Sequence, residues 1–311
     1  IDAGALSTVV NPTTNAVLFR SGEAYSVEIT DNAHTATQLP ELIALNNATT
    51  GEIFLNPGDT GEADLTGSLS DLVSIAGNAL TATQITAGGQ NGFKGLADAT
   101  FTLNDTGVIA ISDLVILNSA TTGADHINAD TATGLTGTFA DAKVIYDANS
   151  TFTTDIDDKP LTLTGTVTVA EANAAAGYTT GILTATVSDT AANLVGLADE
   201  GTNVITVAMT GTTAAATDIN LVNADTAGLI TSTVGTITGS AANIKTAFTA
   251  NDGTQITGLD TAAVTISGGA SVADANIISA ATNGVVTSTI SDNTMTLLKG
   301  IGETGNAYTI T

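Results

Sequence analysis

The sequence has no cysteine and no tryptophan, and aromatic residues make up only 4% of it. Without cysteine the chain can form no disulfide, no thiolate metal site and no cysteine nucleophile. Hydrophobic residues are nevertheless plentiful at 43%, so the chain can bury a core. That core must consist mainly of Ala, Val, Ile and Leu, whose small side chains favour thin stacked layers over a thick globular interior.

Positive charge is also scarce. The 311 residues include 6 Lys and Arg against 31 Asp and Glu, which gives a net charge of −25. Nucleic-acid binding needs clustered cations that neutralise phosphates and release counterions. We therefore expect no nucleic-acid partner. The acidic surface attracts cations, so Ca²⁺ is a candidate ligand, although no cofactor is required.

Long apolar runs are missing too. A membrane-spanning helix needs about 18 or more consecutive apolar residues, and the sequence has no such stretch. We therefore predict no membrane insertion. The chain opens at Ile1 without the charged start of an export signal, so we expect that signal to be absent or already removed.

What the sequence does contain is an internal repeat. The copies read LPELIALNNATTG, ISDLVILNSATTG, VAEANAAAGYTTG, ATDINLVNADTAG and VADANIISAATNG, and start at Leu39, Ile111, Val169, Ala216 and Val272. Every copy has an acid at its third place, Thr at its eleventh and Gly at its last. The acids are Glu41, Asp113, Glu171, Asp218 and Asp274, and the glycines are Gly51, Gly123, Gly181, Gly228 and Gly284.

This first string predicts a short helix that turns into a strand. An acid in the first turn complements the helix dipole, and a closing glycine permits a left-handed exit. Three copies also share an asparagine at the fifth place, namely Asn173, Asn220 and Asn276. We expect these amides to stack as a ladder that bonds loop backbone.

A second string alternates with the first and predicts a second short helix in each repeat. Its third residue is of an N-cap type in all copies: Ser68, Thr138, Thr190, Ser240 and Asn293. Segments of alternating apolar residues, such as 181–187, 228–234 and 284–290, read as strands between the helices. The repeating unit is therefore predicted to be β-α-β-α.

Strands that recur in one direction with helices between them predict a parallel sheet, and single units must stack to bury their apolar faces. We predict an α/β solenoid of stacked β-α-β-α repeats. The alternative is an all-β right-handed parallel β-helix in which the helices are turns. Residues 1–21 would form an N-terminal cap or docking segment, and residues 22–311 a continuous solenoid of about five repeats. Its spacing is irregular over 22–135 and more regular over 136–311.

Three segments carry a family resemblance: TGILTATVSDTAANLVGLA, TITGSAANIKTAF and SVADANIISAATNGVVTSTISD. They resemble the repeats of large secreted or cell-surface proteins of bacteria, notably cyanobacteria, which often stand beside haemolysin-type calcium-binding repeats. The resemblance covers about residues 36–311. It implies export and a role in surface layers, adhesion, motility or extracellular fibres. It carries over no catalytic residue, and the Gly-Gly-x-Gly-x-Asp nonapeptide of the calcium-binding relatives is absent.

Few residues suggest chemistry. Asp155, Asp157 and Asp158 lie close together before Pro160 and form the candidate calcium site, with an acidic solvated turn as the alternative. The two histidines, His34 and His126, are expected in surface loops. The sequence has neither a G-x-S-x-G nor an H-E-x-x-H motif, so we predict that the protein is not an enzyme.

Function is therefore predicted from architecture. The strand-like segments 22–30 and 305–311 look like the same structural strand. We expect either that the repeats continue in a longer parent chain or that copies associate head to tail, and we favour self-association. We predict a secreted, cell-surface structural subunit of an extracellular filament, surface layer or adhesin. A carbohydrate-binding or carbohydrate-active solenoid of the tail-spike type is one alternative, with cell-surface polysaccharide as partner. An ice- or mineral-binding face is another, because threonines such as Thr287 and Thr289 alternate along strands.

Overall fold

The computed structural model covers residues 1–311 and divides them into two compact units. The structure describes residues 10–11, 16–17, 27–29, 33–55, 63–80, 91–122, 126–148, 156–198, 203–226, 228–302 and 304–310. Unit 1 comprises Ile1–Thr162 with Tyr178–Gly181, and unit 2 comprises Leu163–Gly177 with Ile182–Thr311. The two units are described separately.

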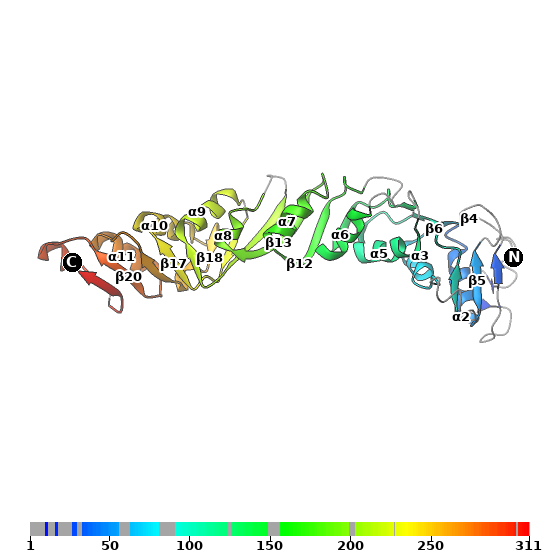
Figure 1. The fold of residues 1–311 in the computed structure, drawn as a ribbon, viewed down its shortest axis with the longest axis horizontal. Helices are drawn as coiled ribbons and strands as arrows, with labels where there is room; N and C mark the ends of the chain where they lie inside the picture. The colour runs from blue at the N-terminus through cyan, green and yellow to red at the C-terminus, as the bar shows by residue number, and fades with distance from the viewer. Residues whose placement is uncertain are drawn as a thin grey trace. The chain divides into compact units, whose positions relative to one another are not determined.

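Unit 1 combines short helices with parallel strands (Figure 1). Its helices are α2 (Leu39–Ala48), α3 (Leu69–Ala76), α5 (Ile111–Ala120) and α6 (Phe139–Asp147). One parallel sheet contains β3 (Val27–Ile29), β5 (Glu52–Leu55) and β7 (Gly92–Lys94). Another contains β4 (Ala33–His34), β6 (Asp64–Gly67), β8 (Thr100–Leu103) and β10 (Ile127–Asn128), and β9 (Val108–Ala110) pairs with β11 (Gly134–Gly137).

The N-terminal segment contributes one antiparallel pair. Strands β1 (Val10–Asn11) and β2 (Ala16–Val17) pair with each other, and both contact α2. The rest of residues 1–21 lies outside the described residues. A cap over α2 therefore stays a prediction.

Unit 2 repeats one arrangement more regularly. Its helices are α7 (Val169–Ala176), α8 (Ala191–Leu194), α9 (Ala216–Asp225), α10 (Ala241–Ala250), α11 (Val272–Ala281) and α12 (Met295–Leu298). Strands β13 (Leu183–Thr190), β14 (Val204–Thr210), β16 (Ile230–Ser232) and β18 (Ile256–Thr257) follow one another in a parallel sheet. A second parallel sheet contains β15 (Thr213–Ala215), β17 (Thr236–Gly239), β19 (Ala263–Ile266), β20 (Val286–Ile290) and β21 (Ala307–Ile310). The chain enters unit 2 within β12 (Leu161–Val167).

The helices arise from the two repeated strings. All five copies of the first string are helices that begin at the first residue of the string. Their first, fourth and seventh residues face the core, as in α11, where Val272, Ala275 and Ile278 are buried. The parallel α/β prediction is therefore confirmed, and these helices exclude the all-β alternative for the described residues.

The second string also forms helices, with one error in the predicted caps. Ser68, Thr138, Thr190 and Ser240 each accept a hydrogen bond from the backbone N–H three residues later, as predicted. Asn293 does not cap its helix. Thr294 takes that place and accepts from the Leu297 N–H, because the helix begins one residue later than the pattern indicates.

Unit 2 is built from layers that each contain one helix with its strands. One such layer is half of the predicted β-α-β-α unit. Helices α9, α10 and α11 lie side by side in chain order (Figure 1). Hydrogen-bonded groups of neighbouring layers are 23 residues apart for Asn220 and Asn243, and 24 for Asn276 and Gly300. Each layer thus contains one helix, and the predicted unit spans two layers.

The core of unit 2 consists of rows of small apolar side chains. Val187, Val207, Ile230 and Ile256 are register partners on four neighbouring strands, and all four are fully buried. Each such side chain contributes about 1.5–3 kcal/mol through burial. Alternate residues of the same strands point outward, which explains the period-two pattern of the sequence.

Candidate functional site

The shared Thr and Gly of the first string join neighbouring layers. The Thr282 hydroxyl donates to the Ala262 carbonyl at 2.6 Å and accepts from the Gly284 N–H at 3.0 Å. Thr179 does the same, since it donates to the Lys159 carbonyl at 2.5 Å and accepts from the Gly181 N–H at 2.8 Å. This repeated position therefore satisfies backbone groups that would otherwise be buried without partners.

The closing glycines correct the predicted left-handed exit. Gly181 and Gly284 are not among the glycines with positive φ. They are required by close approach instead: a Cβ at Gly284 would lie 2.3 Å from the Ala262 oxygen, and one at Gly181 would lie 2.7 Å from the Lys159 carbonyl carbon. At Gly228 the nearest atom would be the Ile205 oxygen at 2.9 Å. Gly51 donates its N–H to the Thr49 hydroxyl at 3.0 Å, and Gly123 lies outside the described residues.

The third-place acids all lie in the first turn of their helices: Glu41, Asp113, Glu171, Asp218 and Asp274. Glu171 completes a capping box with Thr168. Asp274 pairs with Lys245 of the preceding helix, and this contact lowers the pKa of its carboxyl group. Glu41 is buried instead, and desolvation raises the pKa of its carboxyl group. One repeat position therefore serves several different electrostatic roles.

The fifth-place asparagines bond backbone, as predicted. Asn173 donates to the Gly196 carbonyl at 2.8 Å and accepts from the Ala198 N–H at 2.9 Å. Asn276 repeats this pattern with Gly300 at 2.7 Å and Gly302 at 3.1 Å. The predicted stacking of the amides is wrong. Each amide bonds backbone that lies within the next helix or directly after it, and it does not bond another amide.

Three carboxylates cap helices of a neighbouring layer, and sequence reasoning missed them. Asp292 accepts from the Val272 N–H at 2.7 Å, and Asp105 accepts from the Leu69 N–H at 2.5 Å. Asp189 is bonded by Asn193, Thr190 and Val169, and these bonds, led by that of Asn193, lower the pKa of its carboxyl group. The available signal was an Asp that follows Ser or Asn at the end of a strand.

The candidate calcium residues are only partly described. Asp155 lies outside the described residues. The Asp157 backbone carbonyl accepts from the Thr180 N–H at 2.5 Å, and the Asp158 carboxylate lies 3.5 Å from the Lys159 ammonium group. In the part of the chain that the structure describes, no three His, Cys, Asp or Glu side chains form a group that could hold a metal ion.

His126 contradicts its predicted surface position. It is 8% exposed, and its Nδ1 lies 2.8 Å from the Thr121 hydroxyl. Burial follows from its place directly before β10, whose Ile127 lies in the core. His34 lies in β4, and its side chain is outside the described part of the structure.

Two aromatic residues of α6 stack with Tyr178, which is distant in sequence, in unit 1. The Tyr146 and Tyr178 ring centroids are 5.0 Å apart, and those of Phe139 and Tyr178 are 6.2 Å apart. The Tyr146 hydroxyl donates to the Ile156 carbonyl at 3.3 Å. Burial, and then the charge of Asp157, raises the pKa of Tyr146 to about 12. The rings face one another, so this stack attaches the loops around residues 156 and 178 to α6.

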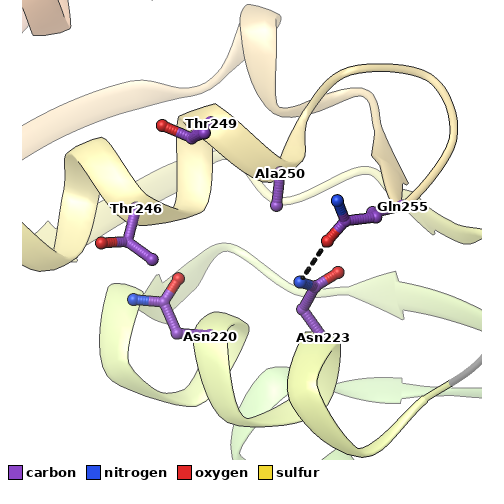
Figure 2. Close-up of a pocket in the computed structure, with 6 residues that line it drawn as sticks. All are labelled: Asn220, Asn223, Thr246, Thr249, Ala250 and Gln255. Atoms are coloured by element: carbon purple, nitrogen blue, oxygen red, sulfur yellow. Dashed lines mark hydrogen bonds between the residues drawn. The ribbon is translucent and has the colours of Figure 1, made fainter.

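A hollow in unit 2 lies between α9 and α10 (Figure 2). It has a volume of about 270 Å³ and is lined by Asn220, Asn223, Thr246, Thr249, Ala250 and Gln255. Figure 2 shows the Asn223 amide directed at Gln255, to whose Oε1 it donates at 2.9 Å. No charged side chain lines this amide pocket.

No family model, curated protein or solved structure matches the chain. Among the helices within the described ranges, none combines the length and the apolar character needed to cross a membrane.

Proposed function

We propose that the layers form an α/β solenoid and that the protein is a structural subunit of an extracellular filament, surface layer or adhesin. The observation that supports this most is the exposure of apolar side chains in the last described layer. Ile310 is 52% exposed, whereas Ile290, its register partner on β20, is fully buried. Met295 and Leu297 of α12 are also exposed, and α12 has no buried residue. One more layer would bury these side chains.

The strand edges indicate how that layer would be supplied. β21 pairs with β20 along one edge, and no described strand pairs with its other edge. β3 likewise ends its sheet and pairs only with β5 among the described strands. We propose that β21 of one copy pairs with β3 of the next. Such a contact between two different edges repeats without closing and yields a filament.

The extracellular setting rests on the resemblance of the repeats to bacterial surface proteins. In that setting the mechanism requires no catalysis. Strand pairing and apolar burial within the chain would simply continue from one copy to the next.

Replacing Ile310 with glutamate tests this assembly. The wild-type protein is expected to form fibres or sheets by electron microscopy and large species by sedimentation. Ile310→Glu should abolish them without lowering Tm, because the side chain is largely exposed. Val204→Glu is the matched control, since Val204 is 57% exposed on β14 and should leave assembly intact. Monomers at all concentrations, with calcium and with chelator, would rule out the proposal.

The outer face of the second sheet of unit 2 favours a second candidate, an ice- or mineral-binding surface. Thr238, Thr265 and Thr287 are register partners on three neighbouring strands, and Thr289 pairs with Thr309. Strands β14 to β21 contain no charged residue. Hydroxyls would then repeat about every 4.8 Å across the strands and about 6.7 Å along them.

Thermal hysteresis measures the ice-binding version of this candidate. A gap between melting and freezing points is expected for the wild type, and Thr265→Lys should reduce it by inserting a charged side chain into the middle of the face. Thr254→Lys, in the exposed loop before β18, is the control and should leave the gap unchanged. The absence of any gap would eliminate ice binding.

A further inference from the structure

We propose that the amide pocket between α9 and α10 binds a neutral saccharide. This proposal does not depend on self-assembly, because all of its residues lie within unit 2. It rests on the hydrogen-bonding groups that remain unused in the pocket, on the absence of charge, and on an apolar groove beside it.

The lining side chains keep groups for a ligand. Asn223 donates to Gln255, which leaves the Asn223 oxygen and the Gln255 amide nitrogen without a partner among the described residues. Asn220 donates to the Asn243 carbonyl at 3.1 Å, which leaves its own oxygen as an acceptor. Each amide offers both donors and acceptors. The pocket therefore presents a donor and two acceptors over a short span.

Two hydroxyls extend this set. Thr246 donates to the Ala242 carbonyl at 3.2 Å and Thr249 donates to the Lys245 carbonyl at 2.8 Å. Both hydroxyl protons are thus used within α10, and both oxygens remain as acceptors. Mixed donors and acceptors without a charge match the hydroxyl groups of a sugar, each of which donates one hydrogen bond and accepts others. An anionic ligand would meet no cation in the amide pocket and a net charge of −25 on the protein. Lys245, which lines the adjoining groove, is paired with Asp274.

A second, more apolar groove lies beside the pocket on α10. It has a volume of about 250 Å³ and is lined by Lys245, Phe248, Thr249, Ile277, Ile278 and Ala281. Thr249 lines both hollows. Sugars present an apolar ring face that packs on aromatic side chains, and Phe248 supplies such a side chain here. A short saccharide would place one unit among the amides and the next against Phe248.

Titration calorimetry with short neutral gluco-, manno- and galacto-oligosaccharides tests the site, and uronic-acid oligomers serve as the charged comparison. We expect at least one neutral series to bind with a Kd of roughly 1 mM or tighter. Thr246→Trp should weaken binding at least about tenfold, because it fills the pocket from an exposed helix position and leaves the core unchanged. Gln255→Ala should weaken binding less, since it removes one donor.

Asn283→Ala is the matched control, because Asn283 is an exposed amide in another loop of the same unit. It should bind like the wild type. Circular dichroism and Tm establish that each variant is folded. The proposal is overturned if no neutral saccharide binds, if only the uronic-acid oligomers bind, or if folded Thr246→Trp binds as tightly as the wild type.

Discussion

Thr282 and Gly284 show how single residues set the distance between layers. The threonine hydroxyl bridges the Ala262 carbonyl and the Gly284 N–H, and Gly284 brings its own backbone against residues 262 and 263. A methyl group at position 284 would lie 2.3 Å from the Ala262 oxygen and 2.6 Å from the Ala263 nitrogen. Because these neighbours are backbone atoms, they cannot move aside as a flexible side chain would.

Gly284→Ala is therefore expected to destabilise the protein by about 3 kcal/mol, as overpacking against rigid atoms does. Urea unfolding followed by circular dichroism measures the change. Gly107→Ala is the control, because a Cβ there would meet nothing within 4 Å. That variant should be neutral or more stable by about 0.5 kcal/mol. Equal effects of the two substitutions would contradict the close-approach explanation.

The helices are too short to be stable alone, since isolated helices below about 12 residues are marginal in water. α7 has 8 residues and α11 has 10. Their first N–H groups are satisfied from the next layer, by Asp189 for α7 and by Asp292 for α11. A carboxylate at a helix N-terminus also interacts favourably with the positive end of the helix dipole. These two helices are thus completed by the layer that follows each of them.

Lowering the pH should weaken the contacts that the Asp189 and Asp274 carboxylates make with neighbouring helices. The pKa values of Asp189 and Asp274 are lowered below the ordinary value of 3.8. Their stabilising contribution is therefore present above about pH 4 and is lost as pH falls through the folded pKa. Asp189→Asn with Asp274→Asn should lower stability at neutral pH and should flatten its decline in acid. Denaturant unfolding at a series of pH values measures both.

Asp225→Asn provides the comparison, because it removes an exposed carboxyl group of α9 outside both contacts. Its stability should keep the pH dependence of the wild type. A double variant with an unchanged acid profile would show that Asp189 and Asp274 do not carry the effect.

At the scale of the whole molecule, the net charge of −25 opposes both folding and association. The cations that the structure describes are largely committed to local pairs, as in Lys94 with Glu52 and Lys143 with Asp147. Burial of small apolar side chains and strand pairing must therefore overcome a general repulsion. Ions in solution reduce that repulsion over distances beyond about 10 Å at 0.1 M salt.

Raising NaCl from about 0.01 M to about 0.5 M should accordingly raise Tm and favour assembly. Differential scanning calorimetry and light scattering measure the two effects. CaCl₂ at equal ionic strength separates screening from specific binding: screening alone predicts the same change, whereas an excess effect of calcium would indicate a bound ion. A Tm that falls with salt would contradict the repulsion.

The predictions that held are those that depend on local spacing. The start of α11 at Val272 and the N-cap of Ser240 follow from neighbouring residues, whose periodicity and hydrogen bonding are visible in the sequence. One failure was also local, because Thr294 and not Asn293 caps α12. Two others concern groups whose surroundings are distant in sequence. Gly284 was assigned a left-handed turn, and His126 was assigned to the surface. The error at Gly284 arises because the backbone that it approaches, at Ala262, lies more than 20 residues away in the chain. The error at His126 arises because its place beside the core is not visible in the sequence.

The sequence by itself determined which residues form helices and strands and which faces are apolar, because propensity, capping and periodicity act over a few residues. Only the tertiary structure decided what each repeated position does. It shows that Thr282 bonds the preceding layer, that Asn276 bonds the following one, and that Asn223 and Gln255, 32 residues apart, meet at one pocket. The physical reason is that parallel layers place side chains beside backbone from a different turn of the chain. Which groups meet depends on the register between strands, and that register is set only when the layers pack.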